Sequence, residues 1–410
     1  MKKNIFVLAM FLCILLFAGC AKKKNLEKIS LTLWTSAREE TMTKDAVKEF
    51  IRIHKNEANL NIDVQVVEID SVKQSLINPS GKTADIFHFA SDQYTDLKNA
   101  GVLSTIDYET GRAIQESGGT SASIIREITQ YGKLYAYPAT NSNGYFLYYN
   151  KQYYSEEDVA TLDNILSIAE KNNKYFAMDF TSGWYLYSFF AAAGKTIKVS
   201  PDGKTNVCTF NSADGNYSGV DVTNALLDIA SHPAFKNVDS DDMTARLKEN
   251  DIIAVVNGTW NAHFFNELWG KNCAAVKLPT YTVKNEQLQM GSFAGYKYLG
   301  VNSKCKHKRW AMKIARWLTT YKYQIRRYKT TGECPANLDA AGSHRVQISA
   351  PIAALNEQNK YATMQNLLDS YWTPMEQFGN TIAAGNPDNV DLQTLLDKTV
   401  QAIQTPTNNK

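Results

Sequence analysis

Four large aromatic residues stand at the ends of predicted strands or near the starts of helices, each beside polar residues. Trp260 and Trp184 both follow a short polar stretch, and Phe89 ends a strand just before one. Trp372 lies two residues before a proline, near a helix start. A flat apolar ring stacks on the C–H face of a sugar, while polar neighbours bond the hydroxyl groups. Any one tryptophan alone is better explained by core packing, but together the four predict a carbohydrate-binding surface.

The motifs of common catalytic and metal sites are absent from the sequence. It contains no G-x-S-x-G, H-E-x-x-H, Walker or G-x-G-x-x-G stretch. Asp239, Asp241 and Asp242 resemble the start of a calcium loop. Thr244 and Asn250, however, occupy the positions that need glycine and glutamate, so a helix N-cap cluster is the simpler interpretation. We therefore expect a protein with no catalytic activity, no metal and no cofactor.

Strands and helices alternate along the chain, which indicates an α/β fold with mixed sheets flanked by helices. Period-two alternation predicts strands, and apolar residues three or four positions apart predict helices. The predicted strands are 29–34, 62–69, 85–89, 145–150, 175–180 and 252–256, and the predicted helices are 42–54, 94–100, 162–169, 184–193, 222–230, 243–247 and 392–403, with a hairpin turn at 200–203. Ligands of such sheets bind beyond the carboxyl ends of strands, where three of the four aromatic residues stand.

The charge balance argues against a nucleic-acid partner. The 410 residues include 44 Lys and Arg against 41 Asp and Glu, and phosphate binding needs a clear cationic excess. The stretch from Lys304 to Lys329 does hold ten basic residues and no acid. Apolar residues at helical spacing within it indicate a core face opposite a solvated one. A docking surface for a membrane partner is the alternative interpretation.

The first twenty residues predict export. Lys2 and Lys3 precede the apolar run 5–18, which is too short to span a bilayer and is typical of a secretory signal. The ending 16–20, LFAGC, resembles a bacterial lipobox, in which the cysteine is acylated. Cys20 is therefore the predicted lipid attachment point, and the lysines at 22–24 suit an anionic membrane surface.

Four cysteines remain in the body of the chain: Cys208, Cys273, Cys305 and Cys334. Their separations fit no zinc pattern. These cysteines can be either disulfide-bonded or buried free thiols, since a body of this size folds without covalent cross-links. We expect that loss of any disulfides leaves the protein folded.

Seven short stretches, in their order and spacing, resemble the maltose/maltodextrin-binding type of extracellular solute-binding proteins of carbohydrate ABC importers. They are Leu31–Trp34, Ala84–Phe87, Gly101–Leu103, Gly132–Pro138, Tyr149–Lys151, Asn257–Trp260 and Leu278–Pro279. The resemblance covers nearly the whole mature chain. It implies a two-lobe, periplasmic-binding-protein-like α/β fold, in which crossing strands form a hinge and the lobes close around a sugar.

The resemblance also implies which residues bind the sugar. Trp260, Trp372 and Trp184 match stacking aromatics of the C-terminal lobe. Phe89 matches a tryptophan of the other lobe, and Asp92 matches a carboxylate that binds sugar hydroxyls.

Other positions depart from the maltose-binding pattern. Arg38 and Glu39 fall where maltose binders carry an acid followed by lysine. Asn143 falls near a glutamate of that type, Glu376 replaces a basic residue, and Tyr185 completes the implied set. The stacking aromatic residues of the family are kept, while the polar residues that bind particular sugar hydroxyls differ. The resemblance therefore implies a sugar ligand but does not identify it as an α-glucan.

The implied segments are a lipoprotein signal peptide at 1–19, a tether at 20–29, an N-terminal lobe at 30–140 and 294–340, and a C-terminal lobe at 141–293 and 341–405. The implied function is that of a monomeric receptor, lipid-anchored outside the cell membrane, which delivers an oligosaccharide to an ABC permease. A surface adhesin or sensory lipoprotein of the same fold is the alternative. A glycoside hydrolase is a further one, although the sequence offers no candidate pair of carboxylates.

Overall fold

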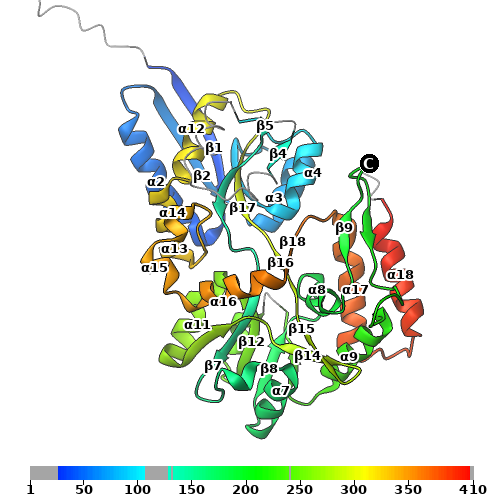
Figure 1. The fold of residues 1–410 in the computed structure, drawn as a ribbon. Coiled ribbons are helices and arrows are strands. Elements are labelled where there is room, and N and C mark those ends of the chain that lie inside the picture. The colour runs from blue at the N-terminus through cyan, green and yellow to red at the C-terminus, as the bar shows by residue number, and fades with distance from the viewer. Residues whose placement is uncertain (1–25, 107–127, 131–132, 240–241, 407–410) are drawn as a thin grey trace, which may run out of the picture.

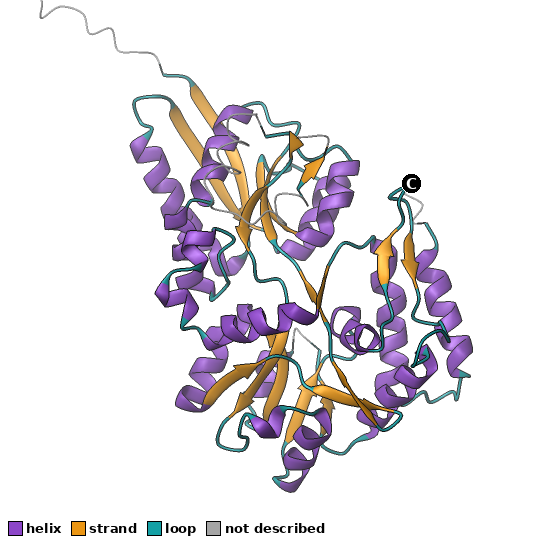
Figure 2. Cartoon of the chain, viewed as in Figure 1, coloured by secondary structure: helices purple, strands orange, loops and turns teal. Residues whose placement is uncertain are grey.

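Two five-stranded sheets, each with helices on its faces, form the two lobes in Figures 1 and 2. The computed structural model describes residues 26–106, 128–130, 133–239 and 242–406. The predicted signal peptide and Cys20 lie outside these residues. No helix within the described part of the chain is long and apolar enough to cross a membrane.

The sheet of the N-terminal lobe has the order β2-β1-β3-β17-β6. Its first three strands run parallel, and β17 pairs antiparallel with both β3 and β6. The strands are β1 (Lys28–Thr35), β2 (Asn59–Val66), β3 (Ile86–Ala90), β6 (Tyr137–Thr140) and β17 (Lys297–Val301). The helices of this lobe are α2 (Glu40–Ile53), α3 (Ile69–Ile77), α4 (Tyr94–Asn99), α12 (Lys308–Leu318) and α13 (Tyr321–Thr331).

The sheet of the C-terminal lobe has the order β11-β8-β12-β7-β13. Its strands are β7 (Tyr145–Asn150), β8 (Tyr175–Met178), β11 (Phe235–Asn237), β12 (Ile252–Gly258) and β13 (Cys273–Val276). The helices are α7 (Leu162–Lys171), α8 (Gly183–Ala192), α9 (Gly219–Ser231), α10 (Met243–Leu247), α11 (Ala262–Trp269), α16 (Ala350–Gln358), α17 (Trp372–Ala383) and α18 (Leu392–Gln404). A hairpin of β9 (Ile197–Val199) and β10 (Asn206–Cys208) turns where the sequence predicts it.

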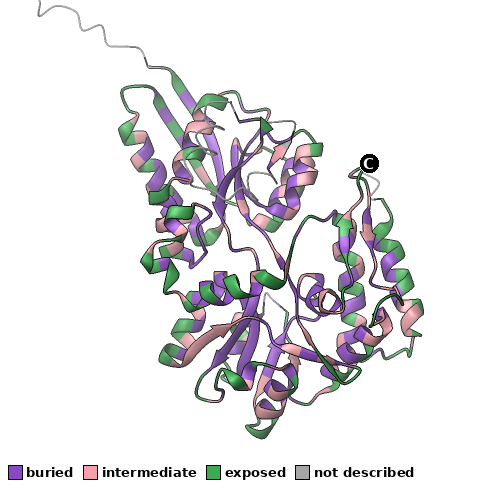
Figure 3. Ribbon diagram, viewed as in Figure 1, coloured by how far each residue is buried: buried purple, intermediate pink, exposed green. Residues whose placement is uncertain are grey.

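The chain passes between the lobes at the centre of the molecule (Figure 1). It crosses from β6 to β7, returns from β16 (Ser292–Ala294) to β17, and crosses again after α13 through α14 (Leu338–Ala341) and α15 (His344–Gln347). β16 pairs with β18 (Ala362–Met364) in this region. Each lobe is therefore assembled from separate parts of the sequence, and each buries its own apolar cluster (Figure 3).

The α/β alternation predicted from the sequence is confirmed, with two local differences. The second strand starts at Asn59 and ends at Val66, because Ile69 begins the following helix α3, which buries Val72 and Leu76. The basic stretch 304–329 forms two helices, α12 and α13, which are separated at Thr319 and Thr320.

Candidate functional site

Trp260 is presented by a short 3-10 helix, η4 (Thr259–Asn261), directly after β12. The buried Asn257 side chain accepts hydrogen bonds from the Gly258 amide at 2.8 Å and from Asn261 Nδ2 at 3.1 Å. Gly258 lets the indole fold back over the chain, because a Cβ built there would lie 2.0 Å from the ring. The half-buried tryptophan is thus fixed at the end of a central strand.

Trp184 is held at the start of α8 by the turn that follows β8. The Asp179 carboxylate accepts hydrogen bonds from the amides of Thr181 at 3.0 Å and Ser182 at 3.1 Å. Tyr145 donates its hydroxyl to the Trp184 carbonyl at 2.7 Å, and the two ring centroids are 5.7 Å apart. The indole is half-buried, so part of its face remains open.

Trp372 is the first residue of α17 and lies beside the start of α8. The buried Tyr371 donates its hydroxyl to the Gly183 carbonyl at 2.8 Å. A Cβ on Gly183 would lie 2.6 Å from Met375, so the two helix starts are in direct contact. The structure therefore brings Trp184 and Trp372 to neighbouring places on the C-terminal lobe.

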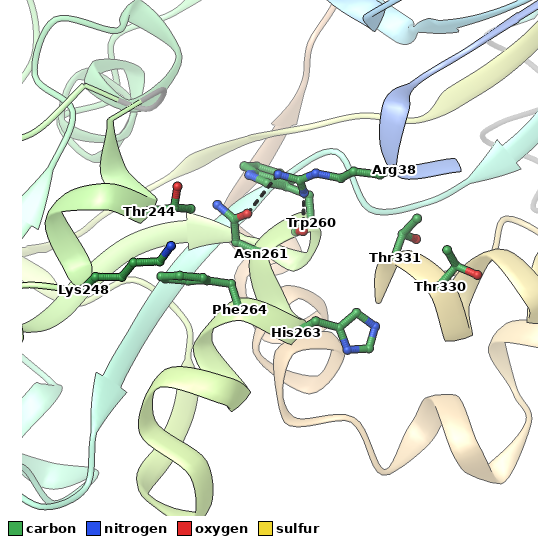
Figure 4. A pocket seen from close by; sticks show the side chains of 9 residues that line it. All are labelled: Arg38, Thr244, Lys248, Trp260, Asn261, His263, Phe264, Thr330 and Thr331. Atoms are coloured by element: carbon green, nitrogen blue, oxygen red, sulfur yellow. Dashed lines mark hydrogen bonds between the residues drawn. The ribbon is translucent and has the colours of Figure 1, made fainter. Parts of the chain in front are cut away.

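Arg38 reaches from the N-terminal lobe to this aromatic region. It lies exposed in η1 (Ala37–Glu39), just after β1. Its guanidinium donates to the Trp260 carbonyl and, at 3.1 Å, to the side-chain oxygen of Asn261 (Figure 4). One of the predicted polar residues thus lies against one of the predicted aromatics, although they are far apart in sequence.

Lys73 of α3 makes a second contact between the lobes. Its ammonium group pairs with Asp369 in η7 (Asp369–Tyr371) and, at 3.2 Å, with Asp96 of α4. Burial alone would lower the pKa of Lys73, but the two carboxylates outweigh it and raise this pKa. Thr95 donates to Asn366 at 3.3 Å beside this pair. No sequence pattern pointed to any of these residues.

Asp92 follows β3 in η2 (Ser91–Gln93) and has a carboxyl oxygen, Oδ1, that is buried without a hydrogen-bond partner among the described residues. Burial raises the pKa of Asp92 to about 7, against the opposing effect of Lys73. Near neutral pH such a carboxyl group can donate or accept a hydrogen bond. It is therefore chemically suited to a hydroxyl-bearing ligand.

Asn143 lies at the crossing between β6 and β7. Its Nδ2 donates to Gln365 at 3.2 Å, and its amide donates to the Gly295 carbonyl at 3.1 Å. Gly295 is closely surrounded, since a Cβ there would lie 2.5 Å from Ser91 Oγ. Glu376 is exposed one turn after the start of α17.

Phe89 and Tyr185 require a correction, because neither ring is available for stacking. Phe89 is fully buried, with its ring centroid 5.5 Å from that of Tyr298. All five residues of β3 are buried, since the strand is covered on both faces. Tyr185 is 5% exposed and packs edge-on against Tyr145 at 5.0 Å. Both rings belong to the cores beneath the site.

Glu39 also needs correction, because its carboxylate points into the N-terminal lobe. Arg327 Nε donates to Glu39 Oε2 at 2.9 Å, and His88 Nδ1 lies 3.4 Å from the same oxygen. Burial alone would raise the pKa of Glu39, but Arg327 and His88 hold it at about 2. Burial lowers the pKa of His88 to about 4. Glu39 is therefore half of a buried ion pair and does not face a ligand.

A pocket of about 430 Å³ opens beside Trp260 and Arg38 (Figure 4). This volume falls within the usual range for small-molecule sites. Its walls come from both lobes and consist of Arg38, Thr330 and Thr331 on one side and Thr244, Lys248, Trp260, Asn261, His263 and Phe264 on the other. Of these residues the sequence nominated only Arg38 and Trp260 as binding residues, although Asn261 could have been found from its position next to Trp260.

Within residues 26–106, 128–130, 133–239 and 242–406, no group of three His, Cys, Asp or Glu side chains could hold a metal ion. Near Trp260 the pocket presents the hydroxyls of Thr244, Thr330 and Thr331 and the amide of Asn261 beside the charged Arg38 and Lys248. Such groups can bond the hydroxyls of a polar ligand.

Two α/β lobes joined by crossing segments, with half-buried aromatics where they meet, define the class of two-lobed solute-binding proteins. The model of the family of bacterial extracellular solute-binding proteins matches residues 47–354. The chain belongs to this family, whose members act outside the cytoplasm. No curated protein is significantly similar to it in sequence.

Solved structures share the fold over almost their whole length. One structure, solved with acarbose, is 25% identical, with a TM-score of 0.82, covering 92% of this chain and 99% of that one. Maltodextrin-binding protein MalE1 from L. casei BL23 is 22% identical, with a TM-score of 0.75 and coverage of 92% and 99%. The maltose-binding protein MalE from Listeria monocytogenes, in complex with maltose, is 23% identical, with a TM-score of 0.69 and coverage of 92% and 97%.

Proposed function

We propose that the chain is the receptor of a carbohydrate ABC importer, which binds an oligosaccharide between its lobes and hands it to the permease without catalysis. The observation that carries the proposal is that three half-buried tryptophans lie on one lobe and pack against its core cluster, and that Arg38 of the other lobe contacts one of them, Trp260. The other two, Trp184 and Trp372, stand at neighbouring helix starts. Stacking rings with polar groups opposite them provide both parts of sugar recognition. The maltose, maltotetraose and acarbose named for similar structures indicate which sugars to test first.

A thermal-shift series followed by calorimetry tests this proposal. Maltose, maltotetraose and acarbose form one arm, and β-linked cello-oligosaccharides of equal length form the control arm. A true ligand raises the melting temperature by mass action, by an amount set by the ratio of its concentration to Kd. If no oligosaccharide in a broad panel shifts the melting temperature, the sugar-receptor proposal is wrong. Hydrolysis of a bound sugar would contradict the proposed lack of catalysis.

The place of the protein at the membrane is a separate proposal. Cys20 would carry the lipid, with 1–19 removed as the signal peptide and 20–29 acting as the tether. Labelled palmitate should enter the wild-type protein and not a Cys20→Ser variant, and the variant should be released into the medium or periplasm. Equal membrane retention of both proteins would contradict the anchor.

The lobe boundaries and the monomeric state complete the proposal. Residues 30–140 and 294–340 would form one lobe, and 141–293 and 341–405 the other. The division is supported by the strands, because β1, β2, β3, β6 and β17 share one sheet while β7, β8, β11, β12 and β13 share the other. Sedimentation of the unlipidated protein should give a single species of about the chain mass, 45.9 kDa less the signal peptide.

A further inference from the structure

One end of the N-terminal lobe carries a surplus of exposed cations. This basic edge consists of Lys28, Lys55, Lys82, Lys304, Lys306, Lys308 and Arg309. Among the described residues at this end, the exposed acids are Glu27 and Glu57, and Glu57 already pairs with Lys313 at 2.8 Å. The partly buried Asp85 is bonded to the Thr32 amide at 2.9 Å. Within the described part of the chain, most of the positive charge on the basic edge is therefore uncompensated.

Backbone and side-chain contacts bring these separate stretches together. The amide of Asn59 donates to the Glu27 carbonyl at 2.9 Å, which joins the first residues of β1 and β2. Asn302 donates to the Ala84 carbonyl at 2.9 Å, and His307 lies 3.7 Å from Glu27. Because β17 runs antiparallel to β3, the start of α12 lies beside the amino end of β1 (Figure 1).

Four other cations of the 304–329 stretch have a different role, since they pair with acids on α2 or close to its two ends. Lys322 pairs with Glu49 at 2.5 Å and Arg326 with Asp45 at 3.0 Å, while Lys313 and Arg327 pair with Glu57 and Glu39. These contacts hold α12 and α13 against the lobe. The seven cations of the basic edge form no ion pair with an acid of the described residues, and neither do the exposed Arg316 and Lys329 elsewhere in the stretch.

The length of the chain before β1 limits where this edge can lie. Seven peptide units separate Cys20 from Glu27, so the two residues are at most about 25 Å apart. A lipid on Cys20, as proposed above, would keep Glu27 and the adjoining basic edge within that distance of the bilayer. Anionic headgroups attract cations so close to the surface.

We propose that the basic edge is a docking surface for anionic phospholipid headgroups, on which the tethered receptor rests. Arg38 and Asp92 follow the carboxyl ends of β1 and β3, at the opposite end of the sheet. β1 has eight residues and spans about 26 Å. With the basic edge on the bilayer, the lobe interface at the other end of the sheet therefore lies away from the membrane. The ligand site then faces the surrounding medium, and delivery to a permease requires the receptor to turn.

Binding of the unlipidated protein to vesicles tests the proposal independently of sugar binding and of acylation. The protein runs from residue 20 to residue 410 with Cys20→Ser, and the vesicles contain phosphatidylcholine with or without about 30% phosphatidylglycerol. The edge variant combines Lys304→Gln, Lys306→Gln, Lys308→Gln and Arg309→Gln. The matched control combines Lys171→Gln, Lys198→Gln, Lys204→Gln and Lys271→Gln, four exposed lysines of the other lobe.

We expect the unsubstituted protein to bind only the anionic vesicles and to be released at about 0.5 M salt. Each cation near the surface should contribute about a fivefold gain, so the edge variant should bind more than about a hundredfold more weakly. The control variant should bind within about twofold of the unsubstituted protein. Equal binding to both kinds of vesicle, or no loss in the edge variant, would overturn the proposal. An edge variant that keeps its sugar-dependent thermal shift separates this outcome from failure of the receptor proposal.

Discussion

Lys73 in the N-terminal lobe and Asp369 in the C-terminal lobe form an ion pair across the interface, 296 residues apart in sequence. Asp369 lies three residues before Trp372, so this pair connects the relative position of the lobes to one of the proposed stacking rings. The Lys73 side chain is 12% exposed and that of Asp369 is 45% exposed, which makes the pair only partly shielded from solvent.

Substitution of Asp369 by Asn should loosen the contact between the lobes. A partly exposed pair contributes about 0.2–1 kcal/mol, so we expect sugar affinity to fall by less than about fivefold. Small-angle scattering without sugar should show a larger radius of gyration than for the wild type. Asp388→Asn, at an exposed site on the same lobe, is the control. A variant that scatters and binds like the wild type would show that the pair does not hold the lobes together.

Loss of either Trp260 or Trp372 should nearly abolish sugar binding. Truncation to Ala removes the stacking face and leaves a cavity, which at binding hot spots costs about 2–4 kcal/mol. Calorimetry measures the loss, and circular dichroism shows whether each variant is folded. Trp310→Ala is the control, because Trp310 packs against Phe50 on the outer side of the N-terminal lobe, with centroids 6.3 Å apart. If both site variants stay folded and their sugar affinities are within about threefold of the wild type, the two tryptophans only pack in the core and do not stack on the sugar.

Substitution of Glu39 by Gln should weaken the fold and leave sugar preference unchanged. The substitution leaves the Arg327 guanidinium, which is 1% exposed, as an unpaired buried charge, at a cost of about 3–5 kcal/mol. Urea unfolding at neutral pH measures this loss. Glu40→Gln, which breaks the exposed pair with Lys44, should cost less than about 0.5 kcal/mol. A change in sugar preference without loss of stability would show that Glu39 binds the ligand, contrary to this assignment.

Asp92 should make the stability of the protein depend on pH. Its pKa is about 7 in the folded state against an ordinary 3.8. At pH values between these two, the carboxyl group is therefore protonated in the folded state and ionised in the unfolded state. The contribution of Asp92 to stability therefore falls as pH rises from about 4 to about 7 and is constant above. The melting temperature of an Asp92→Asn variant, measured relative to that of the wild type, should therefore rise as the pH increases from about 4 to about 7. A difference that does not vary between pH 4 and pH 8 would contradict the buried carboxyl group. Glu39 and His88 contribute to both proteins alike, and their effects cancel in the comparison.

Reducing agents should leave the melting temperature unchanged, because all four cysteines of the body are free thiols in the structure. Burial raises the pKa of Cys208 and Cys334 to about 12, and that of Cys273 to about 11. Thiolate is the reactive form, so a thiol reagent should modify these residues only after denaturation. A fall in melting temperature under reduction would reveal a disulfide.

The sequence alone determined the local elements and the class of the fold. Period-two alternation located β1, the aromatic run located β7, and polar turns located the starts of η4 and α8. These features depend on interactions between residues close in sequence, which a pattern of apolar and polar positions records directly. The same local signals placed Trp184, Trp260 and Trp372 at the ends of strands or the starts of helices.

Only the tertiary structure decided which side chains face the other lobe. Glu39 lies between the exposed Arg38 and the half-buried Glu40, yet it points into the core of the N-terminal lobe, as does Phe89. A central parallel strand is buried on both faces, so it carries no alternation that shows which way a side chain points. The contacts of Arg38 with Trp260 and of Lys73 with Asp369 join residues more than 200 positions apart. Their pairing depends on how two discontinuous lobes pack together, and no local pattern of residues specifies that arrangement.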